Sequence, residues 1–509
     1  MPTVSKTVNT SVTGVALAEE ETPKTLPVLA EWYGRAVIDY SDLGSEVDYV
    51  ADESISASRQ NQFGVPVGIT VGGGYNIYGR NDRTRDLQGF FFADAHEKLD
   101  TGALNGVAVP LTSVAGAGVY GAASGLSVFP SGTIVLASGF TNSANNNVAT
   151  VTGSTGTTLT TDGATVVEAS PPAAARIQQV GFAFGSGDLS LVVLGGLATL
   201  NSTAGDWLNM NLQIGEWVFI GGDDAGAQFT TGYGYGRIVS KDNDNLVLDD
   251  LAWIGTIASD TGAGQSLRVY AGTYIRNEKD PALIKCRSYH IERSLGNDGD
   301  GIQSQYLVGA VASELSVTFP LKERHVMSVT YVALDDITRT GLQGLLGGTR
   351  ISPPNEKLYN TSSDLFRAKM TIHDPSTLAP TPLFEYATEC DFSINNNVTV
   401  AEALGVFGGF DFTVGNFVAG GTASPYFTKV ATIDAVRRGD PCSYDVIVAR
   451  DNQGMVYDMP LVGLKGGQLD ASPGESIKIP LESFAAENEQ GYTMSYTSFS
   501  YLPDVAMPV

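Results

Sequence analysis

Two long segments of this 509-residue chain have similar sequences although they lie far apart. SYHIERSLGNDGDGIQSQYLVGAVASELSVTFPL, from Ser288, runs parallel to SYDVIVARDNQGMVYDMPLVGLKGGQLDASPGESIKIPL, from Ser443. In this alignment the Leu-Val-Gly that starts at Leu307 matches the one that starts at Leu461. Each Leu-Val-Gly follows a Gly- or Asp-rich turn and precedes a segment in which apolar and polar residues alternate, the pattern of a half-buried strand.

A second pair of segments occurs in the same order upstream of the first. VGITVGGGYNIYG, from Val67, matches LGVFGGFDFTVG, from Leu404, and a helix is predicted after each, over 82–96 and 425–438. Internal repeats of this kind indicate a duplicated fold. The chain is therefore expected to hold one β unit twice.

A region of different composition interrupts the first unit. Sixty-one consecutive positions after Asp100 carry no formal charge, and residues 101–270 contain 12 acidic and 4 basic residues among many Gly, Ser and Thr. Within it, GTIVLASG from Gly132 resembles GEWVFIGG from Gly215, and each is followed by a predicted hairpin. We expect an inserted all-β region of small barrel-like modules that projects outward from the first unit.

The resulting prediction is a mainly β chain with flanking helices. Its expected parts are an N-terminal arm (1–30), a first unit (31–100 and 271–345), the insertion (101–270) and a second unit (346–509). Alternation continues in both units, so each sheet should have one dry and one wet face.

Charge and cysteine content limit the function classes. With 55 acidic and 30 basic residues the net charge is −25, which argues against stable binding to nucleic acid or an anionic membrane. No apolar run has the length of a membrane span, and no basic start followed by an apolar run predicts a signal peptide. The three cysteines support neither a disulfide framework nor a zinc site.

Catalytic signatures are missing from the sequence. The four histidines form no HExxH pair, and neither a GxSxG elbow nor a phosphate-binding GxxxxGK[ST] loop occurs. The acidic pairs Asp223-Asp224 and Asp249-Asp250 could suggest a carbohydrate-active enzyme, but adjacent strand residues point to opposite faces. We therefore expect no enzyme, cofactor or metal site.

Four segments resemble the major tail protein, or tail tube protein, of long-tailed, non-contractile bacteriophages. They are RQNQFGVPVGITVGGGYNIYGR, YHIERSLGNDGDGIQSQYLVGAVASELSVTFPLKERHVMSVTYVALD, DFSINNN and MPLVGLKGGQLDASPGESIKIPLESFAAENEQGYTMSYTSF. The likeness covers most of 50–100 and 280–509. GFTNSANNNVATVT also resembles small β modules that are inserted in such tail proteins.

The resemblance implies a tail-tube β-sandwich fold, assembled as rings that stack into a hollow tube through which phage DNA enters the host. The implied partners are further copies of the chain, the tape measure protein, the tail terminator and distal tail proteins, with DNA passing without stable binding. The implied location is the virion tail, after synthesis in the host cytoplasm. Two tube folds per chain favour a ring of three chains. The alternative is an acidic surface adhesin or S-layer-like protein.

Within such a tube, the wet faces would line the channel. Our candidates for lumen-facing residues are Glu314, Ser316 and Thr318 in the first unit and Thr493, Ser495 and Thr497 in the second.

Overall fold

The fold is mainly β, which confirms the predicted class. The computed structural model describes residues 13–40, 42–52, 60, 62–80, 83–103, 107–297, 301–341, 344–353, 357–372, 382–384 and 386–508. The α-helices among these residues are α1 (Thr84–Phe91) and α2 (Val430–Arg438), both shorter than predicted. Helix α2 ends at Arg438, and the left-handed backbone of the next residue, Gly439 (φ 68°), lets its N–H cap the last turn. Neither described helix combines the length and apolar character that crossing a bilayer requires.

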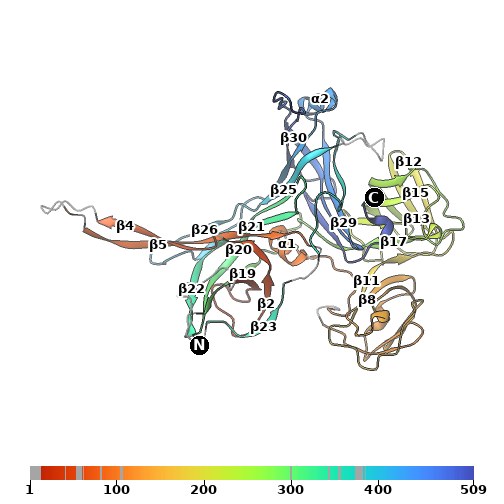
Figure 1. The fold of residues 1–509 in the computed structure, drawn as a ribbon, viewed down its shortest axis with the longest axis horizontal. Coiled ribbons are helices and arrows are strands. Elements are labelled where there is room, and N and C mark those ends of the chain that lie inside the picture. Colours follow the sequence, from red (N-terminus) through yellow and green to blue (C-terminus); the bar gives the residue numbers. More distant parts are fainter. Residues whose placement is uncertain are drawn as a thin grey trace.

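One sheet runs through both units and is called the shared sheet below (Figure 1). Its strand order is β3/β4, β5, β21 and β20 from the first unit, then β25, β28, β31 and β30 from the second. The strands are β3 (Val37–Asp39), β4 (Gly44–Asp52), β5 (Gln62–Tyr78), β21 (Val326–Ala333), β20 (Ile302–Pro320), β25 (Ala387–Asn395), β28 (Val418–Pro425), β31 (Leu481–Ala485) and β30 (Gln453–Gly466). Strands β4 and β5 continue as a two-stranded ribbon that projects from the body (Figure 1).

A second layer covers the dry face of the shared sheet in each unit. The first halves of β20 and β30 belong to this layer, where each pairs with one strand on either side. In the first unit the other strands are β1 (Gly14–Glu19), β19 (Ser288–Asn297) and β22 (Asp335–Arg339). In the second unit they are β24 (Leu365–Ile372), β29 (Cys442–Arg450) and β32 (Ser495–Phe499). Between the layers lies an aromatic core, in which Phe392 stacks on Tyr444 with ring centroids 4.5 Å apart.

The pairings show the duplication strand by strand and correct its alignment. Strand β20 pairs with β22 through Ser304–Val308, whereas β30 pairs with β32 through Gly454–Asp458. Leu307 therefore corresponds to Tyr457, not to Leu461. The counterpart of β5 is β28, because each pairs with the matching strand, β21 or β31, and precedes the helix. Residues 404–415, matched to β5 by sequence, instead hold β27 (Asp411–Thr413), which pairs with β26 (Thr399–Ala401). The sequence alignment of these two segments was wrong because both are rich in glycine.

The predicted N-terminal arm is wrong for its described part. Strand β1 is part of the first unit and pairs with β19, with Val15 and Leu17 buried in the main core. The sequence predicts an arm because polar residues and prolines flank this six-residue apolar segment. A segment this short is stable as a strand only when a neighbouring strand supplies hydrogen bonds, and β19 does so here. Two further strands lie over this unit, β2 (Ala30–Arg35) and β23 (Gly348–Ile351).

The insertion forms a twelve-stranded sheet with two separate hydrophobic cores. In sheet order its strands are β12 (Leu189–Leu194), β13 (Leu197–Ser202), β16 (Asn245–Gly255), β15 (Gly232–Lys241), β14 (Trp217–Ile220), β17 (Arg268–Ala271), β11 (Arg176–Ala183), β8 (Thr133–Ser138), β9 (Val148–Ser154), β10 (Thr158–Thr161), β7 (Val119–Ala122) and β6 (Leu111–Ala115). The two segments matched by sequence fold alike, as the meanders β8–β9–β10 and β14–β15–β16.

The insertion leaves the first unit after α1, and its two ends meet where the backbone of His96 bonds to that of Tyr274. The equivalent connection in the second unit, from α2 to β29, is only residues 439–441. The insertion does not simply project from the first unit, as predicted. It packs on the second unit (Figure 1). The strand that follows the insertion, β18 (Thr273–Arg276), pairs with β32 of the second unit.

Candidate assembly surface and buried charge cluster

The two units are joined edge to edge by β20 and β25. Residues 314–320 pair antiparallel with residues 389–395. On the dry face Leu315 lies beside Ile394 and both are buried, whereas on the wet face Ser316 lies beside Ser393. At the end of the joint the Asn395 amide donates to the Glu314 carboxylate at 2.9 Å. This joint, called the internal joint below, shows how one unit binds the next through strand edges.

The first-unit lumen candidates share the wet face of the shared sheet. Glu314 is exposed, Ser316 and Thr318 are partly exposed, and all three alternate with buried residues of β20. The predicted alternation is therefore present in this strand. Whether this face lines a channel stays a prediction.

The second-unit candidates are wrong for two of three residues. Ser495 and Thr497 are fully buried, and Thr493 is partly exposed. Strand β32 belongs to the outer layer rather than to the shared sheet, and the insertion covers it, so that the Trp217 backbone N–H donates to the Thr497 hydroxyl at 3.3 Å. Residues in this position cannot face a channel.

The wet face of the second unit is formed instead by Lys465, Glu482 and Thr422, which pair side by side across β30, β31 and β28. The Thr422 backbone N–H donates to Asp391 at 2.7 Å, and Asp391 pairs with Thr318 of the first unit. One polar row thus crosses both units. The alternation of buried Leu481 with exposed Glu482 was the sequence signal for this face.

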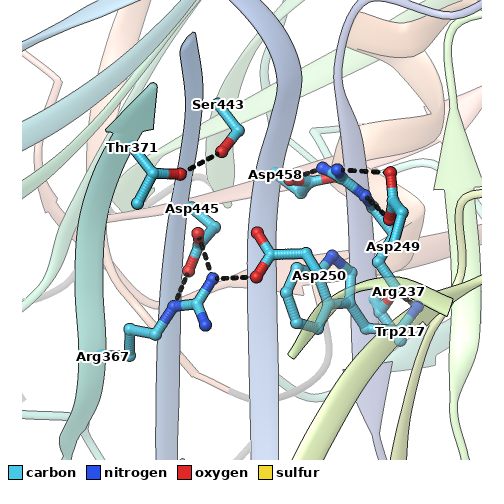
Figure 2. Close-up of polar contacts among 10 residues, drawn as sticks. Trp217, Arg237, Asp249, Asp250, Arg367, Thr371, Ser443, Asp445 and Asp458 are labelled. Carbon is cyan, nitrogen blue, oxygen red and sulfur yellow. Dashed lines mark hydrogen bonds and ion pairs between the residues drawn. The ribbon is translucent and has the colours of Figure 1, made fainter. Parts of the chain in front are cut away.

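A cluster of buried charges holds the insertion on the second unit (Figure 2). Arg237 of β15 forms a two-bond pair with Asp249 of β16, at 2.9 Å for both bonds. Its remaining nitrogen donates to Asp458 of β30 at 3.0 Å. Arg237 and Asp458 are both nearly inaccessible to solvent, so this bond crosses a dry interface.

A second arginine crosses the same interface in the opposite direction (Figure 2). Arg367 of β24 binds Asp445 of β29 through two bonds of 2.7 and 2.6 Å, and donates to Asp250 of the insertion at 2.9 Å. Its guanidinium lies over the Trp217 ring, 5.5 Å from the ring centroid. Adjacent Asp249 and Asp250 thus bind different arginines, as neighbouring strand positions require.

The pKa values of these carboxylates depend on how well arginine offsets burial. Burial raises the pKa of Asp458 to about 7 despite the charge of Arg237. Burial also raises the pKa of Asp445, which Arg367 only partly opposes. For Asp250 burial acts in the same direction, but the charges of Arg367 and Arg237 prevail and the pKa is lowered. Separating the insertion from the second unit would leave these buried charges without their partners, and an unpaired buried charge is costly.

Apolar packing surrounds the charge cluster. Trp217, Tyr235 and Tyr270 of the insertion form one buried core with residues of the second unit, among them Ile447, Val456 and Phe499. The Tyr235 hydroxyl donates to the carbonyl of Ala506 at 3.0 Å.

On the first unit, Trp32 of β2 and Tyr306 of β20 are buried together, and Arg350 binds Glu292 beneath Trp32. Each outer layer is therefore covered, but by different parts of the chain.

Each aspartate of the cluster is held by arginine, and within the described residues no group of three or more His, Cys, Asp or Glu side chains could hold a metal ion. Cys286 is exposed, whereas Cys390 and Cys442 are buried, and none is in a disulfide.

Comparison with known proteins found no family model that matches the chain and no curated protein that matches it.

Proposed function

We propose that this chain is a structural subunit of a hollow tube, the major tail tube protein of a long-tailed, non-contractile bacteriophage. The observation that carries the proposal is the internal joint between two units of the same strand order. Unit one contributes β3/β4–β5–β21–β20 and unit two β25–β28–β31–β30, so each unit presents the same two edges.

The joint is heterologous, because the edge formed by β20 differs from the edge formed by β25. Heterologous contacts generate closed rings when the rotation closes, and open filaments when it does not. The internal joint is one such contact within the chain. The other edges of the two units, β3/β4 in unit one and β30 in unit two, correspond to the two edges of that joint. Three chains then make a ring with six units, in which internal and chain-to-chain joints alternate.

The polar row on the wet face supports a role in conducting DNA. It consists of hydroxyls and carboxylates, with Lys465 as a cation held by Glu482 at 3.3 Å. Duplex DNA carries about one negative charge per 1.7 Å, and each cation that is free to pair with phosphate would slow its passage. The net charge of −25 favours a surface that DNA does not bind. The tape measure, terminator and distal tail proteins are the further partners this role implies, in the virion tail.

Electron microscopy of the concentrated, purified protein tests the proposal. We expect rings or tubes with a central channel, and an end-on view with three outer projections formed by the insertion. A protein that stays monomeric at all concentrations, or that binds glycans as a monomer, would favour the adhesin alternative.

A further inference from the structure

We propose that the ribbon formed by β4 and β5 packs on the second unit of a neighbouring chain, over Leu461, Phe484 and Ala486. The proposal rests on the ring-forming function above and names the partner of the ribbon, a second copy of this chain. It follows from a contact that the chain already makes internally, between the second unit and the first.

The ribbon carries many apolar side chains for an element that projects from the body. Six of them are more than half exposed: Val47, Tyr49, Val50, Phe63, Val65 and Val67. Tyr49 and Phe63 contact each other edge to face, with ring centroids 6.0 Å apart. A group of exposed apolar side chains marks a surface that contacts another molecule.

The corresponding connection of the second unit packs on the first unit. Residues 396–417 connect β25 to β28, the strands that hold the places of β3/β4 and β5 in the strand order. Val398 and Phe412 of this connection form one apolar cluster with Val311 of β20 and Val332 of β21. The connection therefore crosses the internal joint and covers two strands of the other unit.

Hydrogen bonds fix this connection on the first unit. The buried side-chain amide of Asn396 donates to the carbonyls of Phe90 and Ala312, at 3.0 and 3.1 Å. The backbone N–H of Gly409 donates to the carbonyl of Leu334 at 3.0 Å. The second unit thus holds the first by this connection as well as by β25.

The second unit contains the counterpart of the site that the connection covers. Leu461 holds the place of Val311, because each lies four residues after a matched residue, Tyr457 or Leu307. Each also comes directly before a residue that is buried in the main core. The same position of the fold is therefore occupied by an apolar residue in both units.

The neighbouring strand extends this counterpart site. Val332 pairs with Val311, and in the second unit the backbone N–H of Ala486 donates to the carbonyl of Leu461 at 2.9 Å. Ala486 therefore holds the place of Val332. Ala486 is exposed, Leu461 is partly exposed, and the nearby Phe484 ring of β31 is 47% exposed, whereas Val311 is buried.

A second chain brings the ribbon and this site together. Within one chain they lie at opposite ends of the strand order, with β4 and β5 in the first unit and β31 and β30 at the end of the second. Adjacent strands lie about 5 Å apart, so the covered site on β20 and β21 extends about 10 Å from β25. Strand β4 has nine residues and spans about 30 Å, which is long enough to cross the equivalent joint between chains.

Photo-cross-linking of the assembled protein tests this contact. p-Benzoyl-L-phenylalanine replaces Val65 in an unlabelled chain, which is mixed before assembly with an excess of isotope-labelled wild-type chain. After irradiation, mass spectrometry should find position 65 linked to labelled peptides from 454–490, since the label identifies a second chain. The same replacement of Phe412 should link to unlabelled peptides from 308–334, which are part of its own chain. Val167, an exposed residue of the insertion, is the matched control and should give no link to 454–490.

The outcomes separate this contact from the proposed function. If rings form and position 65 links only to other regions, or only within its own chain, the contact is wrong although the tube function stands. If the wild-type protein forms no rings, the proposed function fails and this contact fails with it. A second measurement needs no inserted probe: Phe484→Ser should reduce sedimentable assemblies and leave the melting temperature unchanged. Assembly equal to that of the wild type would contradict the contact.

Discussion

Replacing Asp458 by asparagine should remove part of the pH dependence of stability. Asp458 is buried where the insertion meets the second unit, and its pKa is raised to about 7 from 3.8, chiefly by burial. An aspartate with a raised pKa binds its proton more tightly in the folded than in the unfolded chain. Its contribution to the free energy of unfolding is therefore largest below pH 3.8, falls as the pH rises toward 7, and is lost above that value.

The magnitude follows from this pKa. At pH 6 the carboxyl is mostly protonated in the folded chain, and at pH 8.5 it is ionised, so linkage gives a loss of about 1 kcal/mol between the two. Asparagine stays neutral and keeps an oxygen that can accept from Arg237. The Asp458→Asn variant should then lose about 1 kcal/mol less than the wild type over this range.

Urea denaturation at pH 6 and pH 8.5, followed by circular dichroism, measures this difference. Because the chain has several parts, the comparison uses the transition in which the insertion separates from the second unit. Asp48→Asn, the same chemical change on the exposed ribbon, is the matched control. An Asp458→Asn variant with the same change between the two pH values as the wild type would refute the reasoning.

Three further predictions concern the interface between the insertion and the second unit, and the ribbon formed by β4 and β5. Arg367→Met leaves Asp445 and Asp250 buried without their shared cation, so urea denaturation should show a loss of about 3–5 kcal/mol; a loss below 1 kcal/mol would contradict the pairing. Deleting 101–270 should yield aggregated protein on size-exclusion chromatography, because it exposes the core around Ile447, Val456 and Phe499; a soluble, folded product would contradict the docking. Phe63→Ser, at a ribbon residue that is 91% exposed, should leave the melting temperature unchanged and reduce sedimentable assemblies. The control Leu194→Ser, at a residue 79% exposed on the insertion, should change neither, and equal assembly of the two variants would exclude a role for the ribbon.

Local sequence patterns predicted which segments form strands more reliably than they predicted whether each strand is exposed to solvent. The alternation in β20 identified which residues of that strand are buried, because a half-buried strand needs an apolar face. The same reasoning failed at Ser495 and Thr497. Their alternation with larger residues is compatible with a wet face, but a second layer covers them, and that layer comes from a region more than 200 residues away.

The charge cluster could not be predicted from the sequence, for the same reason. The sequence shows Asp249 and Asp250 as an acidic pair, but their partners are an arginine on the neighbouring strand and another in the second unit. Asp458 carried no signal at all, since a single aspartate in a strand is usually exposed. Only the folded chain shows that it meets Arg237.

Alternation and turn residues were enough to predict a mainly β chain, because both patterns depend on near neighbours along the chain. The alignment of the two units, the place of β1 in the sheet and the position of the insertion became visible only in the folded chain. Those features depend on which distant surfaces exclude water from one another, and contacts between distant surfaces leave no periodic trace in the sequence.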